Sequence, residues 1–318
     1  MHHDKTDHAA KGKWRGILME FGIPAKTLTG KHTSCPLCGG VDRFRFDNKE
    51  GRGTYICGQC GAGNGFDLAM KFTGKSFGEV ASAIDGFVGN VKPEAIQKPM
   101  GEEKRVKALR SVWLDSKAVT PGDLADKYLR SRGLGENEYP KALRFAPALP
   151  DGEGGVRPCM IALVGVYGEK PATLHRTFLR PDGLAKAEME SPRKLMPGEV
   201  PDGVCVQLSD WTGGPLGIAE GIETALAASA LYDMPVWSAI NAGFLEKWMP
   251  PSDCTEVAVF GDNDTKFGGQ AAAYKLAHKL AVKGLQVTVH IPRQEGADWA
   301  DEWATRAASQ SHRARGAA

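Results

Sequence analysis

The last third of the chain repeats a simple pattern in which short apolar runs alternate with longer mixed segments. The apolar runs have the length of buried strands, and the segments between them are predicted to be helices. Strands that alternate with helices indicate βαβ units and a mostly parallel sheet. The predicted strands are residues 216–219, 236–240, 257–260 and 286–291.

The first two thirds of the chain are patterned less regularly. A short amphipathic stretch comes first, a segment rich in Cys and Gly follows, and a helix pair is predicted after it. The middle of the chain mixes one predicted helix with short strands. These predicted elements are residues 14–21, 66–87, 123–132, 160–167 and 173–179.

The pattern divides the chain into four parts. Residues 91–110 are rich in Pro and charge, so we expect a linker or the start of an exposed helix there. This segment separates an N-terminal domain, 1–90, from a middle segment, 111–212, and a C-terminal domain, 213–318.

Composition indicates a soluble protein, with 42% hydrophobic and 25% charged residues. No apolar run approaches the roughly 20 residues of a membrane span, and the polar N-terminus has no secretory signal. We therefore expect a cytoplasmic protein without membrane contact, in which paired cysteines are metal ligands before disulfides. The first 110 residues carry 18 Lys and Arg against 12 Asp and Glu, a surplus of six that fits nucleic-acid binding or simple solubility.

Four of the seven cysteines form two CxxC pairs with 18 residues between them. This spacing is typical of a structural Zn2+ site with four thiolate ligands, one pair from each of two turns. The predicted zinc ligands are Cys35, Cys38, Cys57 and Cys60. The isolated cysteines, at 159, 205 and 254, are expected to be small core residues.

Cations and aromatic residues alternate between the two pairs. Strand alternation puts Arg43 and Arg45 on one face and Phe44 and Phe46 on the other. Such interleaving suits single-stranded nucleic acid, although the two Phe side chains are better explained as the core of a small ribbon. We keep Arg43 and Arg45 as candidates for nucleic-acid binding.

The run of residues 30–74, GKHTSCPLCGGVDRFRFDNKEGRGTYICGQCGAGNGFDLAMKFTG, resembles the zinc ribbon of phage and plasmid primases. It is most similar to the primase-helicase type of satellite phage P4. The resemblance implies that the ribbon recognises a single-stranded DNA template.

Acidic residues follow two of the predicted strands in the C-terminal domain. Glu220 ends one strand, and Asp262 and Asp264 follow another in the sequence GDND. In open α/β sheets ligands bind beyond the carboxyl ends of the strands, so the three carboxylates are expected to meet at one edge. Carboxylates that converge in this way bind hard divalent cations, Mg2+ or Mn2+, which promote phosphoryl transfer.

Other acids are weaker candidates. Asp298 and Asp301 follow the last strand and could join the site through metal or water, but they also suit a helix N-terminus. Glu223 lies in the first turn of a predicted helix, where an acid complements the helix dipole. We rank Asp298 next to the three strand-end acids as a catalytic candidate, and Glu223 and Asp301 below it.

The order EG, DxD, DxxD over residues 213–305 resembles the Toprim domain of DnaG-type primases, type IA topoisomerases and some nucleases. One departure is Ala300, where this motif often has Asn. The resemblance implies an α/β protein: a small β zinc ribbon, a mixed α+β segment and a C-terminal Toprim domain with a mostly parallel sheet.

The middle segment, through residues 128–134 and 175–183, resembles the part that precedes Toprim in these primases. Its basic residues would hold template or the incoming triphosphate, or they are ordinary solvated charges. These residues are Arg176, Arg180, Lys186, Arg193 and Lys194.

Together the resemblances imply a DNA primase, a nucleotidyltransferase that makes short RNA primers on single-stranded DNA from ribonucleoside triphosphates. Its setting would be the replication of a phage, plasmid or integrative element, in the cytoplasm of the cell or host. The chain has no P-loop, so we expect a replicative helicase in trans.

Alternatives are a Toprim nuclease and a non-catalytic recombination mediator of the RecR type, which also joins a four-Cys zinc site to Toprim. A type IA topoisomerase fits less well, because none of the six Tyr residues has a suggestive context.

Overall fold

The computed structural model describes residues 2–94, 101–189 and 191–306. The chain forms two compact units, Met1–Gly101 and Glu102–Ala318. Among the described residues, no helix is both long and apolar enough to cross a membrane.

The first unit contains a four-stranded antiparallel ribbon. Its strands, in spatial order, are β1 (His32–Thr33), β2 (Phe44–Phe46), β3 (Tyr55–Cys57) and β4 (Gly61–Gly63). Phe44 and Phe46 are 0% and 1% exposed, and Phe44 stacks on Tyr55 with ring centroids 5.6 Å apart. The two Phe side chains therefore form the ribbon's own core, as the alternation predicts.

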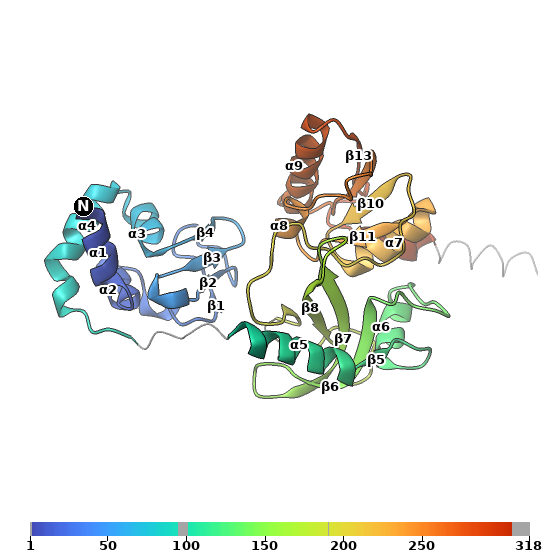
Figure 1. Ribbon diagram of the computed structural model, residues 1–318, viewed down its shortest axis with the longest axis horizontal. Helices are drawn as coiled ribbons and strands as arrows, with labels where there is room; N and C mark the ends of the chain where they lie inside the picture. The colour runs from blue at the N-terminus through green and yellow to red at the C-terminus, as the bar shows by residue number, and fades with distance from the viewer. Residues whose placement is uncertain (1, 95–100, 190, 307–318) are drawn as a thin grey trace, which may run out of the picture. The chain divides into compact units, whose positions relative to one another are not determined.

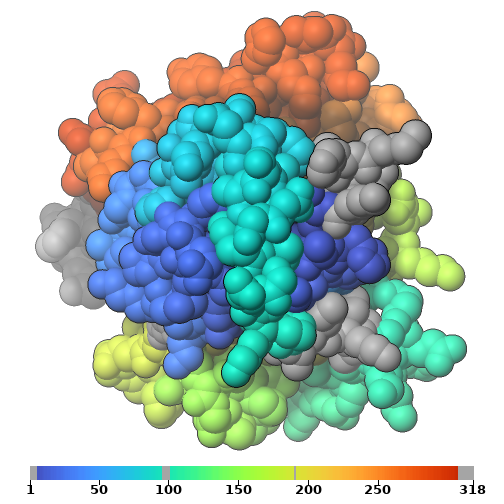
Figure 2. Space-filling model, turned by 90° about the vertical axis from the view of Figure 1, so that its left-hand side faces the viewer, coloured from blue at the N-terminus to red at the C-terminus, as the bar shows by residue number. Residues whose placement is uncertain are grey.

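Helices before and after the ribbon complete the core of this unit. They are α1 (His2–Ala10), α2 (Trp14–Glu20), α3 (Gly65–Thr73) and α4 (Phe77–Phe87), with 3-10 turns η1 (Ala25–Thr27), η2 (Lys49–Gly51) and η3 (Val88–Asn90). Buried Trp14 packs edge-on against Phe66, with ring centroids 4.9 Å apart. Figure 2 shows the helical face of the unit, where the segment from α4 to η3 crosses over the N-terminal helices.

The ends of α3 and α4 follow from their sequence. Asn64 and Ser76 each begin a helix with a reciprocal capping box, and Gly74, in a left-handed conformation, ends α3. The stretch TGKS at 73–76, the part of the sequence nearest to a P-loop, is therefore a turn between two helices.

The second unit begins with helix α5 (Glu102–Asp115), which includes residues 102–110 of the expected linker or helix start. A five-stranded antiparallel sheet follows, with α6 (Leu124–Ser131) between its first two strands. Its strands, in spatial order, are β5 (Lys117–Ala118), β6 (Leu143–Pro150), β7 (Val156–Gly165), β8 (Pro171–Phe178) and β9 (Arg193–Leu195).

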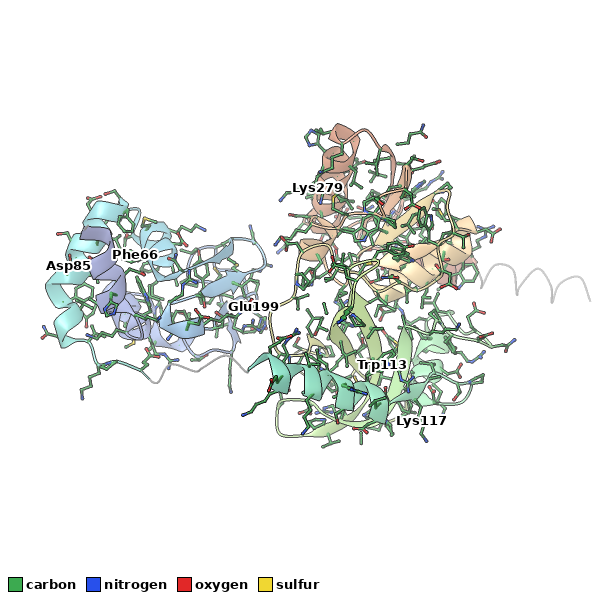
Figure 3. The ribbon with its side chains drawn as sticks, viewed as in Figure 1. Phe66, Asp85, Trp113, Lys117, Glu199 and Lys279 are labelled. Carbon is green, nitrogen blue, oxygen red and sulfur yellow. The ribbon has the colours of Figure 1, made fainter. Side chains whose placement is uncertain are left out.

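The two faces of this sheet pack against different partners. Helix α5 crosses one face and packs Leu109, Val112 and Trp113 against it (Figure 1). Trp113 is labelled in Figure 3. The guanidinium carbon of Arg144 lies over its ring, 4.9 Å from the ring centroid. The opposite face carries the core that the sheet shares with α6 and with the C-terminal domain.

The C-terminal domain is the mostly parallel sheet that the sequence predicts, and in fact all its described strand pairs are parallel. In spatial order its strands are β11 (Val236–Ser238), β10 (Leu216–Ala219), β12 (Glu256–Phe260) and β13 (Gln286–His290). Its helices are α7 (Ile222–Tyr232), α8 (Ala242–Leu245) and α9 (Gly268–Val282), and residues 299–306 form a further helix.

Alternation along β12 shows how the C-terminal sheet is covered on both faces. Val257 and Val259 belong to the core under α9, whereas Ala258 and Phe260 belong to the core shared with α7 and the antiparallel sheet. Lys279, labelled in Figure 3, fastens α9 by donating to the backbone oxygens of Glu246 and Trp248. Strands β10 and β12 pair directly in parallel register, so their carboxyl ends lie side by side.

Candidate active site and zinc site

The sulfur atoms of the four paired cysteines lie within 4.8 Å of one another. The Sγ atoms of Cys35 and Cys60 are 3.9 Å apart, as are those of Cys38 and Cys57. Tetrahedral Zn–S bonds of about 2.3 Å require S···S separations of about 3.8 Å. The cluster therefore fits a structural Zn2+ ion held by four thiolates.

Backbone amides support the thiolates in both turns. Gly39 and Gly61 have φ values of +70° and +80°, which let the chain curl behind each CxxC pair. The Leu37 amide donates to the Cys35 sulfur at 3.4 Å, and a hydrogen bond from the Gly40 amide is the main cause that lowers the pKa of Cys38 to about 7. These amides stabilise the charged form that binds zinc.

The two ribbon arginines lie in different places. Arg43 lies near the zinc site, and Arg45 lies on the outer face of the sheet. Arg43 donates to the Gln59 side chain at 2.6 Å, beside the second CxxC pair. Arg45 pairs across the sheet with Ile56, which is 45% exposed, and its guanidinium is 3.7 Å from Asp47. The outer face thus presents a cation and an apolar side chain together.

In the second unit, Glu220 follows β10 and Asp262 and Asp264 follow β12. Burial raises the pKa of Glu220, and the charge of Asp264 adds to the rise. Burial also raises the pKa of Asp262 to about 7, with further contributions from Glu220, Asp298 and Asp264 in that order. The four catalytic candidates therefore share one electrostatic environment at the edge of the sheet.

The chemistry of these side chains suits hard divalent cations such as Mg2+. None of the described residues donates a hydrogen bond to the buried Oδ1 atom of Asp262. The side chains around it offer carboxylate oxygens, which are the ligands that Mg2+ prefers. Among the described residues only the cysteine cluster brings three or more ligand atoms within 4.8 Å of one another, so the carboxylate oxygens of these acids are not gathered that closely.

Local contacts hold the GDND loop in place. Asn263 donates its backbone and side-chain N–H groups to the backbone oxygens of Ala297 and Pro292, which ties the loop to the last motif. The Gly269 amide donates to the Asp264 carboxylate at 2.8 Å. A Cβ atom at Gly269 would lie 2.7 Å from the Asp262 backbone oxygen, so only glycine lets α9 start this close to the loop.

A strained turn after β11 supports Glu220. Ile240 has a φ of +76°, a costly conformation for a β-branched residue, and it leads directly into the Asn241 cap of α8. This turn brings the Ala242 amide to the Glu220 carboxylate, a hydrogen bond that opposes the rise in the pKa of Glu220.

Asp298 and Asp301 have the geometry of a helix N-terminus. Each accepts the other's backbone N–H, at 2.9 and 3.2 Å. Arg132, at the end of α6, is 3.5 Å from Asp298 and 3.6 Å from Asp301. Asp298 thus acts on Asp262 through its charge while it caps the last described helix.

Strand alternation separates the five basic candidates. Arg193 lies on the face of β9 that looks toward the acids, and its charge counteracts the rise in the pKa of both Glu220 and Asp262. Arg176 and Lys194 pair across β8 and β9 on the opposite face, where they bind the backbone oxygens of Leu195 and Asp151. The sequence held this signal, because Leu174 and Phe178, which are core residues, lie two positions from Arg176 and so share its face of β8.

The other two basic candidates, Arg180 and Lys186, have different partners. Arg180 is engaged by Asp182 at 2.9 Å and by Glu188 at 3.6 Å. Lys186 is 3.2 Å from Glu223, on the same side as Arg193. Of the predicted basic series, the structure brings only Lys186 and Arg193 to the side of the acids.

Two buried polar residues lie near this group: Glu223, a lower-ranked candidate from the sequence, and His175, which sequence reasoning missed. Glu223 is 7% exposed and accepts the Tyr128 hydroxyl. His175 is 5% exposed, its Nδ1 atom has no hydrogen-bond partner, and burial lowers its pKa to about 4. Only the alternation of His175 with Leu174 and Arg176 in β8 could have indicated that it faces inward.

Three family models match the chain. They are the zinc-binding domain of primase-helicase over residues 30–66, a domain of unknown function (DUF7146) over 103–206 and the Toprim domain over 215–309. The zinc ribbon and the Toprim domain inferred from the motifs are therefore confirmed.

The chain is also similar to solved primase structures, at low identity. The zinc-binding and RNA polymerase domains of the Aquifex aeolicus primase share 15% identity, with 97% of this chain and 84% of that one covered at a TM-score of 0.43. The primase fragment of the bacteriophage T7 primase-helicase shares 14% identity, with 87% of this chain and 98% of that one covered at a TM-score of 0.39. A DNA primase domain from Pseudomonas aeruginosa shares 13% identity, with 62% of this chain and 73% of that one covered at a TM-score of 0.42.

Replacing one zinc ligand should unfold the ribbon. We expect Cys57→Ser to lose the bound zinc and the amide protection of residues 32–63, because a ribbon this small depends on its metal. Metal analysis and hydrogen exchange on the full chain measure both effects. Cys254→Ala, which changes a cysteine outside the cluster, should retain the zinc. Equal zinc content and protection in Cys57→Ser would contradict the assignment.

Replacing Asp262 should stabilise the metal-free second unit in a pH-dependent way. The raised pKa means that Asp262 keeps its proton in the folded state up to about pH 7 but loses it near pH 4 when unfolded. The contribution of Asp262 to the free energy of unfolding therefore falls as the pH rises from about 4 to 7. At pH 8 without Mg2+, Asp262→Asn should raise the free energy of unfolding by on the order of 2 kcal/mol, and at pH 5 the gain should be less than half as large.

Denaturant unfolding of the zinc-bound full chain at both pH values measures this difference. Added Mg2+ should stabilise the wild type at pH 8 and have little effect on Asp262→Asn. If Asp262→Asn changed the free energy of unfolding by the same amount at both pH values, ionisation of Asp262 would not be the cause of the destabilisation.

Proposed function

We propose that the protein is a DNA primase that makes short RNA primers on single-stranded DNA, in the replication of a phage, plasmid or integrative element. The observation that carries the proposal is the group of acids Glu220, Asp262 and Asp264, whose carboxyl groups the charge of Arg193 also affects, in a chain that also has a primase-type zinc ribbon. Neighbouring carboxylates and cations are what a nucleotidyl-transfer site needs, because one set binds metal and the other binds phosphate.

In this proposal the ribbon holds the template. Arg43 and Arg45 contact its phosphates, and exposed Ile56 lies beside Arg45 on the same face. Contacts of this kind fix the position of a strand and lose affinity as salt increases.

The second unit would perform the transfer. The 3′-oxygen of the growing primer bonds to the α-phosphorus of the incoming ribonucleotide, and pyrophosphate leaves. Glu220, Asp262 and Asp264 would hold Mg2+, which on binding would activate the 3′-hydroxyl and neutralise the departing pyrophosphate. Arg193 and Lys186 bind the triphosphate, and Asp298 adds negative charge beside Asp262. Unwinding of the template would come from a separate replicative helicase.

A primer-synthesis assay tests the proposal. With single-stranded DNA, Mg2+ and ribonucleotides, the wild type should make short RNA, and Asp262→Ala should reduce the rate by about 100-fold or more, because it removes a charge that the reaction needs. Asp202→Asn is a matched control: Asp202 is an exposed acid 2.8 Å from Lys247 and should be dispensable.

Two outcomes would overturn the proposal. If the wild type and Asp262→Ala both bind DNA but neither makes primers, a non-catalytic mediator is the better description. If the wild type cleaves DNA with Mg2+ and makes no RNA, the site is that of a Toprim nuclease.

A further inference from the structure

Glu223 occupies an unusual place for an acid in the first turn of a helix. Such acids are commonly exposed and interact with the helix dipole. Glu223 is instead 7% exposed, and its Oε1 atom accepts the Tyr128 hydroxyl and lies 3.2 Å from Lys186 Nζ. Burial alone would raise the pKa of Glu223, but mainly the charge of Lys186 and then the Tyr128 hydroxyl bring it down to about 2.

These contacts join three distant parts of the chain. Tyr128 comes from α6, Lys186 from the segment between β8 and β9, and Glu223 from α7, three residues after Glu220. Removing one partner of a buried ion pair is costly, because the other is left with an unpaired charge. The position of Lys186 beside the first turn of α7 therefore depends on Glu223.

Lys186 needs such a partner if it is to hold a phosphate. Its side chain is 33% exposed, so it reaches solvent as well as Glu223. A lysine side chain that is free to rotate loses rotamer entropy when it is fixed. Contact with Glu223 fixes it in advance, on the side where Arg193 acts on Glu220 and Asp262.

We propose that Glu223 is a positioning residue that holds Lys186 toward the triphosphate of the incoming nucleotide, and that it is not a metal ligand. This inference rests on the proposed function. The Glu223 carboxylate contacts Tyr128 and Lys186, whereas one oxygen of Asp262 has no hydrogen-bond donor among the described residues. The acids after β10 and β12 thus divide into those that hold metal and one that orders a cation.

The chain offers a matched control on the other face of the antiparallel sheet. Asp151 is 1% exposed, accepts the amides of Glu153 and Gly155, and pairs with Arg157 at 3.0 Å. Like Glu223 it is a buried acid that holds a cation. It faces away from the proposed site, so its loss reports the purely structural effect of removing a buried acid.

The test measures nucleotide binding and primer synthesis separately. Binding of a ribonucleoside triphosphate analogue with a non-cleavable α–β bond gives Kd by calorimetry, and primer extension gives KM and kcat. Glu223→Gln should raise Kd and KM about tenfold and change kcat less than threefold. Lys186→Met should do the same, and the double variant should bind no more weakly than Lys186→Met alone.

Three further variants separate positioning from folding. Asp151→Asn should lower Tm as much as Glu223→Gln does, with Kd unchanged. Tyr128→Phe leaves the ion pair and should keep Kd within about twofold, and Glu223→Asp should restore part of the lost affinity. If Glu223→Gln does not fold, Lys186→Met and Tyr128→Phe still decide, because equal effects of the two on Kd would overturn the inference.

Other results would also overturn it. Unchanged Kd in a folded Glu223→Gln, additive effects in the double variant, or a matching loss in Asp151→Asn would each show that Glu223 is structural only. A wild type that binds the analogue but makes no primers would instead remove the proposed function, while the Kd comparison would still test the role of Glu223.

Discussion

Repulsion between partly buried carboxylates is the constraint on which the second unit depends. Burial and three neighbouring acids raise the pKa of Asp262 to about 7, so the metal-free site is strained at neutral pH. The surrounding contacts prevent the acids from moving apart: Asn263 ties the loop to the last motif, and Gly269 lets α9 close on it. A site held in this way gains most when a divalent cation enters, because binding removes the repulsion.

The antiparallel sheet before the C-terminal domain gives this crevice its positive side. Its strands alternate, so one face carries Arg193 toward the acids and the other buries Arg176 against Phe178. Helix α6 contributes Tyr128 to Glu223 and Arg132 to Asp298 and Asp301, and the Trp303 indole donates to Gly133 just beyond that helix. The antiparallel sheet and the C-terminal domain also share one apolar core, so these polar contacts are fixed by packing.

Local patterns in the sequence were enough to predict the zinc ligands, the parallel strands and the acids at their ends, because spacing and periodicity determine them. The roles of Glu223 and Arg132 could not be predicted in this way. Tyr128 and Glu223 are 95 residues apart, and nothing near either residue shows that they meet. Acids in the first turn of a helix are also commonly solvated. The burial of Glu223 results from the packing of α6 against α7, which the local sequence does not show. Within the basic series, alternation along β8 and β9 places Arg176 and Lys194 on one face and Arg193 on the other, a division that charge alone does not show.

The central claim is that Asp262 and Glu220 hold metal whereas Glu223 orders a cation. Titration of the zinc-bound full chain with Mn2+, followed by the paramagnetic resonance signal of the free ion, tests this without requiring catalysis. The account predicts that Asp262→Asn and Glu220→Gln weaken Mn2+ binding at least about tenfold and that Glu223→Gln binds it as the wild type does. Loss of Mn2+ binding in Glu223→Gln, with unchanged binding in Asp262→Asn, would contradict it.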